Sequence, residues 1–340
     1  MSGMSTRLGF RTRGGPTQGW GNIFRLASFA RYCQRSGDVQ TVFFAEGPVE
    51  VRDYLLDQGF EVVMLPEDIS PAEEDRALAK YDAVEVLFAE MLDITQERQR
   101  VLRKHTDRLV IFDDLCDHIY EAHLVVSGQD LPSYANRALS HPLTEFLVGY
   151  DYFLCRPEFI PYAQRQREFS PHLTRVLVTL GGGSYDVGYL KAAMALAKLN
   201  VEATFVLGYA DQGDLPDRIH ELLPHAQVLA GVDDLEQRMW DSDLVIGSAG
   251  YTKLEAALTQ TPCLMMSVQW HQIPLAAAFA ERTGTPDLGY MSYVEPAALL
   301  KELRAMEAPE TRAAHARSAC LAVDGKGFER VHSAIFGEAA

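Results

Sequence analysis

The strongest constraint on the fold is an alternation, along most of the chain, of short apolar runs with amphipathic segments. Residues 39–46 (VQTVFFAE) and 107–114 (DRLVIFDD) have the length of a strand, and their apolar residues follow one another with little interruption. Residues 22–36 instead carry apolar side chains at helical spacing and are followed by Gly37, a typical helix stop. Strands that are apolar on both faces and alternate with helices predict parallel sheets covered by helices, which is an α/β fold.

The alternation is interrupted at residues 155–173 (CRPEFIPYAQRQREFSPHL), which contain three prolines and a polar run. A second alternating series follows, and 340 residues are enough for two domains with separate cores. We therefore predict two Rossmann-like, doubly wound domains at residues 1–160 and 161–323, facing a cleft. A C-terminal helix at 324–340 could pack back across them. Ligands of such domains bind at the carboxyl ends of the strands.

Composition excludes several partners. A formal net charge of −16 argues against nucleic acid, which attracts basic surfaces. No apolar run reaches the roughly 18 residues of a transmembrane helix, and the N-terminus lacks the apolar core of a signal peptide. The five cysteines are scattered without a C-x-x-C pair, which predicts reduced thiols in the cytoplasm. We expect no transmembrane segment and no cofactor.

The N-terminal segment has the opposite charge. Residues 1–37 contain six arginines and no acid, a net charge of +6. Within residues 7–25 (RLGFRTRGGPTQGWGNIFR), a strand-like start leads through a glycine-rich turn into a helix. Glycines and the free amides of a helix N-terminus favour binding of an anion. A tight turn without a ligand is the simpler alternative, with Asn22 as a helix N-cap.

Two further glycine-rich loops occur in the second half. Gly181, Gly182 and Gly183 directly follow a strand-like run, with Ser184 and Asp186 suited to cap the next helix. In residues 242–258 (SDLVIGSAGYTKLEAAL), a strand-like run ends at Gly247–Gly250 and a helix begins near Thr252. Helix capping without a bound ligand would explain either loop alone. Two glycine-rich loops in the same half of the chain favour a nucleotide-binding site.

Glu255 lies in the first turn of that helix. A carboxylate there can accept hydrogen bonds from both ribose hydroxyls, while open amides suit a diphosphate. The alternative is that Glu255 only complements the helix dipole.

Polar side chains follow two other strand-like runs. Gln269, His271 and Gln272 precede a helix, where they could reach a sugar; a histidine there is more often a capping or hydrogen-bonding residue than a base. The aspartates after the run at 107–112 could hold magnesium, but loop capping is the commoner role, and we expect no metal site: Asp113, Asp114 and Asp117.

The order and spacing of these motifs resemble the family of the UDP-sugar hydrolase of pseudaminic acid biosynthesis and the related spore-coat polysaccharide biosynthesis proteins, which have the GT-B fold. The similarity covers nearly the whole chain. It rests on the segments FRTRGGPTQGWGNIFRLASFA (10–30), IFDD (111–114), FLCRPEF (153–159), LVTLGGGSYD (177–186), SDLVIGSAGYTKLEAAL (242–258) and VDGKGFERV (323–331).

The resemblance implies that the C-terminal domain binds a nucleotide sugar. Glu255 would contact the ribose, and His271 and Gln272 the sugar. Phosphate or sugar contacts would come from the glycine loops and their neighbours: Gly181, Gly182, Gly183, Ser248, Gly250 and Thr252. The N-terminal domain would supply Arg11, Gly19, Gly21 and Arg25.

Two positions depart from the family pattern. Asn22 stands where the family has the histidine that activates water, and Arg13 where it has an aspartate. An amide cannot accept a proton from water at neutral pH, whereas an added arginine suits an anionic substrate. We therefore expect a glycosyltransferase that uses a UDP- or CMP-linked sugar and a glycan or protein acceptor. Candidate bases are Asp113, Asp114, His118 and His271. The alternatives are a nucleotide-sugar hydrolase and an inactive sugar-nucleotide-binding protein.

Overall fold

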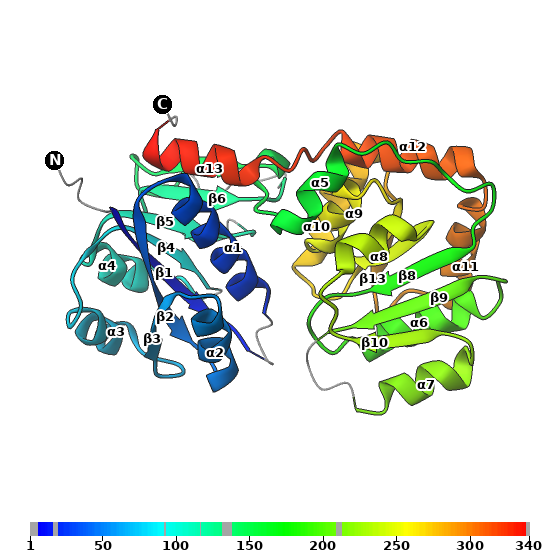
Figure 1. The fold of residues 1–340 in the computed structure, drawn as a ribbon, viewed down its shortest axis with the longest axis horizontal. Helices are drawn as coiled ribbons and strands as arrows, with labels where there is room; N and C mark the ends of the chain where they lie inside the picture. Colours follow the sequence, from blue (N-terminus) through cyan, green and yellow to red (C-terminus); the bar gives the residue numbers. More distant parts are fainter. Residues whose placement is uncertain are drawn as a thin grey trace. The chain divides into compact units, whose positions relative to one another are not determined.

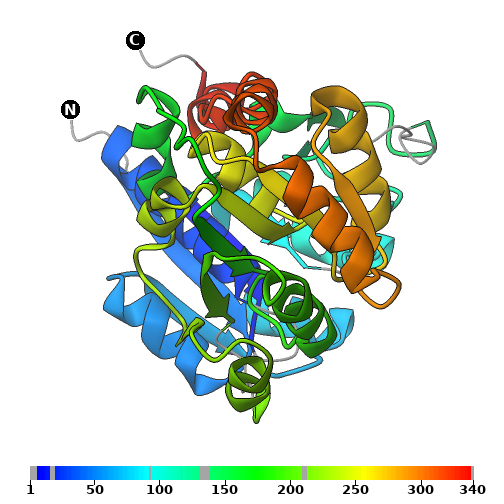
Figure 2. The ribbon, with the colours of Figure 1, turned by 90° about the vertical axis from the view of Figure 1, so that its right-hand side faces the viewer.

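The computed structural model describes residues 6–15, 20–91, 93–115, 117–130, 138–208 and 213–337. The chain forms two compact units, Met1–Arg156 with Lys326–Ala340, and Pro157–Gly325. Each unit is built on one parallel sheet with helices packed against it, as Figures 1 and 2 show. The predicted α/β fold with two doubly wound parallel sheets is therefore confirmed. Within the described ranges, no helix is long and apolar enough to cross a membrane.

The first unit contains a seven-stranded sheet with the order β3-β2-β1-β4-β5-β6-β7. Its strands are β1 (Thr6–Arg13), β2 (Val39–Glu46), β3 (Glu61–Leu65), β4 (Val84–Glu90), β5 (Thr106–Phe112), β6 (Leu124–Ser127) and β7 (Glu145–Val148). Its α-helices are α1 (Gly21–Ser36), α2 (Val49–Asp57), α3 (Pro71–Leu78), α4 (Gln96–Arg103) and α13 (Gly327–Phe336).

Aromatic residues form the centre of this unit. Phe10 on β1 stacks between Phe43 on β2 and Phe88 on β4, with ring centroids 4.9 Å apart in both pairs. All three side chains are fully buried, which explains why these strands are apolar along their whole length. Because β1 lies between β2 and β4, the strand order reverses here, and the loops after β1 and β4 diverge at the carboxyl edge of the sheet.

The C-terminal helix α13 packs on the first unit (Figure 1). Phe328 lies 5.6 Å from Phe29 of α1, centroid to centroid, and Arg108 of β5 donates a hydrogen bond to the carbonyl of Ile335 at 2.7 Å. Gly327 begins the helix against the backbone, since a Cβ at this position would lie 2.0 Å from the carbonyl oxygen of Phe153. A glycine is therefore required for this close approach.

The second unit contains a six-stranded sheet with the order β10-β9-β8-β11-β12-β13. Its strands are β8 (Arg175–Thr179), β9 (Glu202–Leu207), β10 (Gln227–Ala230), β11 (Leu244–Ser248), β12 (Cys263–Ser267) and β13 (Asp287–Tyr290). Its α-helices are α5 (Ile160–Ala163), α6 (Asp186–Leu196), α7 (Leu215–Leu222), α8 (Leu235–Asp241), α9 (Thr252–Leu258), α10 (Gln272–Thr283), α11 (Pro296–Ala305) and α12 (Pro309–Cys320). The order reverses between β8 and β11, so the two predicted glycine loops follow adjacent strands.

Candidate active site

A buried network of ion pairs lies at the carboxyl end of β1 in the first unit. Arg11 has no exposed side-chain surface and pairs with Glu46 at 2.6 Å and with Glu74 of α3. Glu74 also pairs with Arg98 of α4, and Arg13 pairs with Glu46. The acids come from elements that are distant in sequence, so the positive charge of Arg11 and Arg13 is balanced inside the unit. Contact of either arginine with a ligand stays a prediction.

Arg13 lies nearer the solvent than Arg11. Its guanidinium contacts Asp93 and the largely exposed Asp68, each at 3.0 Å. Burial alone would lower the pKa of Arg13, but the hydrogen bond to Glu46 and the nearby carboxylates raise it instead. Arg13 therefore stays charged, and it links the buried network to the surface.

The first turns of α1 carry a second polar cluster. Arg25 pairs with Glu90 at the end of β4 and, at 3.4 Å, with Asp114 after β5. The side-chain oxygen of Asn22 accepts a hydrogen bond from Arg25 at 3.3 Å. Residues three apart on a helix lie on one face, which places Asn22 and Arg25 together at the carboxyl edge of the sheet.

The prediction that Asn22 caps this helix is wrong. The helix begins at Gly21, which is exposed, and Trp20 occupies the N-cap position without a side-chain hydrogen bond. Asn22 is therefore the second residue of the helix. Its side-chain oxygen accepts a hydrogen bond from Arg25 and does not cap the helix. Gly19, predicted to line the same turn, lies outside the described residues.

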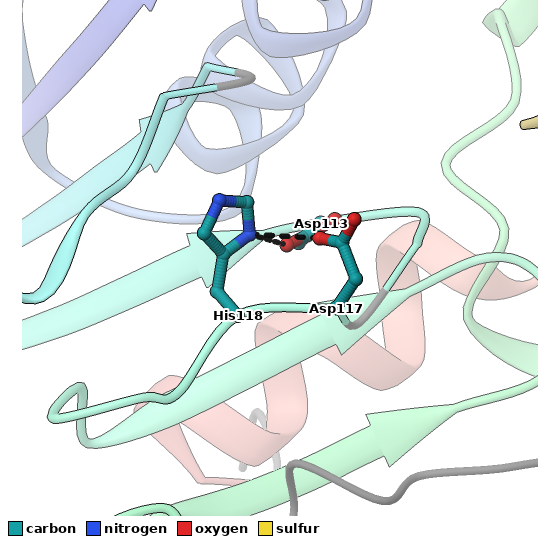
Figure 3. A group of neighbouring side chains, drawn as sticks. All are labelled: Asp113, Asp117 and His118. Carbon is teal, nitrogen blue, oxygen red and sulfur yellow. Dashed lines mark hydrogen bonds and ion pairs between the residues drawn. The ribbon is translucent and has the colours of Figure 1, made fainter.

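A histidine–aspartate pair follows β5. His118 Nδ1 lies 2.9 Å from Asp113 Oδ2 and 2.9 Å from Asp117 Oδ1, and Figure 3 shows the second ring nitrogen pointing away from both carboxylates. Asp113 also accepts hydrogen bonds from the Tyr120 hydroxyl at 2.6 Å and the Leu115 amide at 2.9 Å. Three donors thus hold the Asp113 carboxylate in place, and the carboxylate in turn fixes the orientation of the His118 ring.

These contacts shift the pKa values of both Asp113 and His118. Burial would raise the pKa of Asp113, but hydrogen bonds from His118 and Tyr120 outweigh it and lower the pKa. The hydrogen bond to Asp113 raises the pKa of His118 above its usual 6.5. A histidine oriented by a buried carboxylate has the geometry of a general base, with Nε2 as the proton acceptor.

The same residues form a group that could hold a cation. One oxygen each from Asp113 and Asp117 and one nitrogen of His118 lie within 4.8 Å of one another. Two oxygens and a nitrogen suit a small divalent ion, but Nδ1 of His118 already contacts both carboxylates.

In the second unit, the loop after β8 is shaped by its glycines. Gly181 has a φ of +100°, a conformation that side chains disfavour, and a Cβ on Gly208 after β9 would lie 2.4 Å from the carbonyl carbon of Gly182. Gly182 itself has no atom within 4 Å of where a Cβ would lie, and Gly181, Gly182 and Gly183 are each partly exposed. The backbone here is accessible to a ligand.

The capping roles predicted for Ser184 and Asp186 are wrong. Helix α6 begins at Asp186, and Tyr185 occupies the N-cap position without a side-chain hydrogen bond. Asp186 instead pairs with Arg218 of α7 at 3.2 Å. The N-cap residue itself thus makes no side-chain hydrogen bond to the first-turn amides of α6.

The loop after β11 is held by buried polar contacts. The Ser248 hydroxyl donates to Thr252 at 3.0 Å. Lys253 is fully buried, and its ammonium donates to the carbonyls of Ala249 at 2.6 Å and Gly250 at 2.9 Å. Lys253 is not among the predicted site residues, although it lies within the glycine-loop motif at residues 242–258. Its positive charge beneath the loop favours an anion at the loop's surface.

Gln272 connects this loop to the next one. A Cβ on Gly250 would lie 3.1 Å from Gln272 Nε2, and Gln272 Oε1 accepts a hydrogen bond from the Val268 amide at 2.9 Å. His271 is exposed at the N-cap position of α10 and makes no side-chain cap. Glu255 is half-buried in the first turn of α9. The structure thus brings the residues of β11, α9 and α10 to one edge of the sheet.

A cavity of about 160 Å³ lies at the opposite edge of this sheet. It is lined by residues at the start of β8 and β9 and around the end of α8, including Arg175, Glu202, Arg238 and Asp241. Ligands of doubly wound sheets bind at the carboxyl ends of the strands, so this cavity is not part of the candidate site.

Comparison with known proteins gives no family model that matches the chain. The chain is 21% identical over 275 residues to the uncharacterized protein MJ1062 of Methanocaldococcus jannaschii, and the match covers 76% of this chain and 55% of that protein. The chain thus spans about half the length of the curated relative it matches.

Solved structures share the fold over nearly the whole chain. MurG of Acinetobacter baumannii has a TM-score of 0.68 at 14% identity, covering 97% of this chain and 99% of that one. Anabaena HepE in complex with UDP and glucose has a TM-score of 0.59 at 17% identity, covering 97% and 99%. UDP-GlcNAc 2-epimerase from Neisseria meningitidis bound to UDP-GlcNAc has a TM-score of 0.62 at 10% identity, covering 97% and 99%. These likenesses show the GT-B fold, with two Rossmann-like domains.

Proposed function

We propose that this chain is a glycosyltransferase that transfers a sugar from a UDP- or CMP-linked donor to a hydroxyl of a glycan or protein acceptor. The GT-B fold and the UDP and UDP-GlcNAc bound to structurally similar proteins support a nucleotide sugar as donor. The motifs shared with the pseudaminic-acid hydrolase and spore-coat families support a role in surface polysaccharide or flagellin glycan synthesis of the nonulosonic acid type. The described cysteines are free thiols, which is consistent with a cytoplasmic enzyme.

Donor binding is assigned to the second unit. The accessible backbone at Gly181, Gly182 and Gly183 and the loop from Ser248 to Gly250 would bind the diphosphate, assisted by the N-terminal end of α6 and by Lys253. Glu255 would accept the ribose hydroxyls. Backbone amides that are fixed before the ligand arrives can stabilise the charge that develops on the leaving nucleotide.

The observation that carries the proposal is the His118–Asp113 pair at the carboxyl edge of the first sheet. His118 Nε2 would take the proton of the acceptor hydroxyl as the oxygen attacks the anomeric carbon. The bond between that carbon and the phosphate oxygen breaks, and the nucleotide leaves with the electron pair. Asp113 holds the ring and stabilises the imidazolium that forms.

Asn22 and Arg25 lie at the same edge as this pair, because Arg25 contacts Asp114, the neighbour of Asp113. Their hydrogen-bonding groups would position the acceptor hydroxyl, which is a role that an amide can perform. Roles for Arg11, Arg13, Gly19 and His271 in binding stay predictions.

Product analysis tests this assignment. The protein is incubated with UDP- and CMP-linked sugars, with and without saccharide acceptors, and the products are separated by chromatography and mass spectrometry. Transferred sugar that appears only with an acceptor, and that is lost in His118→Gln, is the expected result. Nucleotide-sugar binding without any turnover would instead indicate an inactive binding protein.

A hydrolase is the second candidate, and the same pair supports it. His118 Nε2 could take a proton from water as readily as from an acceptor, with Asn22 orienting the water. Free sugar released at the same rate with and without acceptor would establish hydrolysis of the pseudaminic-acid type and overturn the assignment as a transferase.

A further inference from the structure

Three aromatic side chains gather at the carboxyl edge of the second sheet, outside its core. Trp270 follows β12, Tyr290 ends β13, and Tyr293 lies in the turn after it. Trp270 stacks on Tyr290 with centroids 4.2 Å apart and planes 16° apart, and Tyr293 lies 6.1 Å from Trp270 and 5.9 Å from Tyr290. The sheet register pairs Ser267 with Tyr290, which brings the end of β13 beside the loop that carries Trp270. We call these three residues the aromatic platform.

The platform contributes little to the core. Trp270 is 59% exposed and Tyr293 is 72% exposed, and none of the three rings belongs to the hydrophobic core cluster of this unit or packs against it. Since Tyr290 covers one face of the Trp270 indole, most of the exposed area lies elsewhere on that ring. Large exposed aromatic surface is unfavourable in water and commonly marks a binding surface.

The residues around the platform indicate which kind of ligand it could bind. Residues 267–272 (SVQWHQ) and 288–294 (LGYMSYV) contain no lysine, arginine, aspartate or glutamate. The ammonium of the nearby Lys191 donates a hydrogen bond to the carbonyl of Ser292 at 2.7 Å. The negatively charged residues Asp287 and Glu295 flank the second of these segments. A phosphate would need basic partners, whereas aromatic faces beside uncharged polar groups suit a molecule with an apolar face and hydroxyl edges.

The platform also lies close to the residues that the proposed function assigns to the donor. Trp270 directly precedes His271 and Gln272, and Gln272 contacts the loop after β11, to which the proposed function assigns the diphosphate. The platform lies one and two strands outward from that loop, on β12 and β13. It therefore lies at the same edge of the sheet as that loop, on its β12–β13 side.

We infer that the aromatic platform is a subsite for a pyranose ring, whose C–H face packs on the exposed face of Trp270 while Gln269 and His271 face its hydroxyls. This inference deepens the proposed function and rests on it for the link to the donor. The ring could belong to the nucleotide-linked sugar or to a glycan acceptor, because both present the same chemistry.

Calorimetric titration of the full chain distinguishes these sources. Wild type, Trp270→Ala, Trp270→Phe and Leu321→Ala are each titrated with UDP, with UDP-N-acetylglucosamine and with N-acetylchitotriose. Leu321 is the matched control, since it is 83% exposed in the same unit but lies outside the platform. Trp270→Ala should weaken binding of a sugar-bearing ligand by about tenfold, as expected when an aromatic contact is truncated. UDP affinity should stay unchanged, which also shows that the variant is folded, and Trp270→Phe should retain most of the affinity.

The outcomes separate the two claims. Loss confined to UDP-N-acetylglucosamine assigns the platform to the donor sugar, and loss confined to N-acetylchitotriose assigns it to an acceptor. If wild type binds either sugar ligand and Trp270→Ala binds it equally well, the inference is overturned while the proposed function stands. If wild type binds neither UDP nor UDP-N-acetylglucosamine, a UDP-linked donor is excluded, and the N-acetylchitotriose titration alone decides the platform. Absence of binding to all three ligands overturns the platform inference and leaves a CMP-linked donor as the only form of the proposed function.

Discussion

Replacing Glu74 with glutamine should destabilise the first unit strongly. Glu74 has no exposed side-chain surface and pairs with both Arg11 and Arg98, which are themselves buried. Glutamine keeps one acceptor oxygen but places an amide donor against the other guanidinium, so one buried arginine loses one of its two carboxylate partners. Breaking a buried ion pair from one side costs about 3–5 kcal/mol. With a urea m-value of about 2 kcal/mol/M, the unfolding midpoint of this unit should fall by roughly 1.5–2.5 M.

The assay must report the first unit separately, because two domains need not unfold together. Of the three tryptophans, Trp20 belongs to the first unit, while Trp240 and Trp270 belong to the second. In a Trp240→Phe/Trp270→Phe background, the fluorescence of Trp20 therefore follows the first unit during urea unfolding.

The control is Glu61→Gln, which removes a surface pair. Glu61 is 58% exposed on its side chain and lies 3.6 Å from Arg7, so its loss should cost at most about 1 kcal/mol. Salt should reduce the small effect of Glu61→Gln and leave that of Glu74→Gln nearly unchanged, since buried pairs are poorly screened. Equal midpoints for the two variants would refute the reasoning that Arg11 and Arg98 depend on Glu74.

Three further predictions follow from named contacts. In Asp113→Asn, His118 loses the negatively charged acceptor whose hydrogen bond raises its pKa. Since the base works only when neutral, the rise of kcat/KM with pH should move to lower pH than in wild type, and the maximal rate should fall about 10²–10⁴-fold; an unmoved profile would exclude His118 as the base. Glu255→Ala should weaken UDP binding by about 100-fold or more in a calorimetric titration, because two hydrogen bonds to a charged group are lost. Glu281→Ala, at an exposed site on α10, should leave the affinity unchanged; equal affinities for the two variants would remove the ribose assignment. Gly327→Ala forces a methyl group to within 2.0 Å of the Phe153 carbonyl oxygen, so it should lower the free energy of unfolding by about 1–3 kcal/mol and increase amide hydrogen exchange in α13. Hydrogen exchange at the wild-type rate would show that the start of the helix can shift to make room for the methyl group.

Much of the fold could be predicted because burial on both faces leaves a clear mark on a strand. Residues 39–46, predicted as a strand, are β2 with the same bounds, and the predicted strand at residues 107–114 overlaps β5, which begins one residue earlier and ends at Phe112. Strand β4 was not identified, because Glu85 and Glu90 interrupt its apolar run. Glu90 is buried in spite of its charge, since it pairs with Arg25.

The candidate site was predictable only in part. Local motifs located the glycine loops and the aspartates after β5, but they could not show which charges meet. Arg11 pairs with Glu46 at a separation of 35 residues and with Glu74 at 63, so the charge of this buried arginine is balanced by acids that lie far away in the sequence. The helix start at Gly21 depends on backbone geometry, which one capping residue type does not determine. The aromatic platform needed the register between β12 and β13.

The most direct test of the central claim is the release of nucleotide from a UDP-linked sugar by wild type and by His118→Gln, with UDP affinity measured on the same samples. If the His118–Asp113 pair is the base, turnover should fall about 10²–10⁴-fold at saturating donor and acceptor. UDP affinity should stay unchanged, because we propose that the donor binds to the second unit. Wild-type turnover in His118→Gln, with the same UDP affinity, would contradict the account.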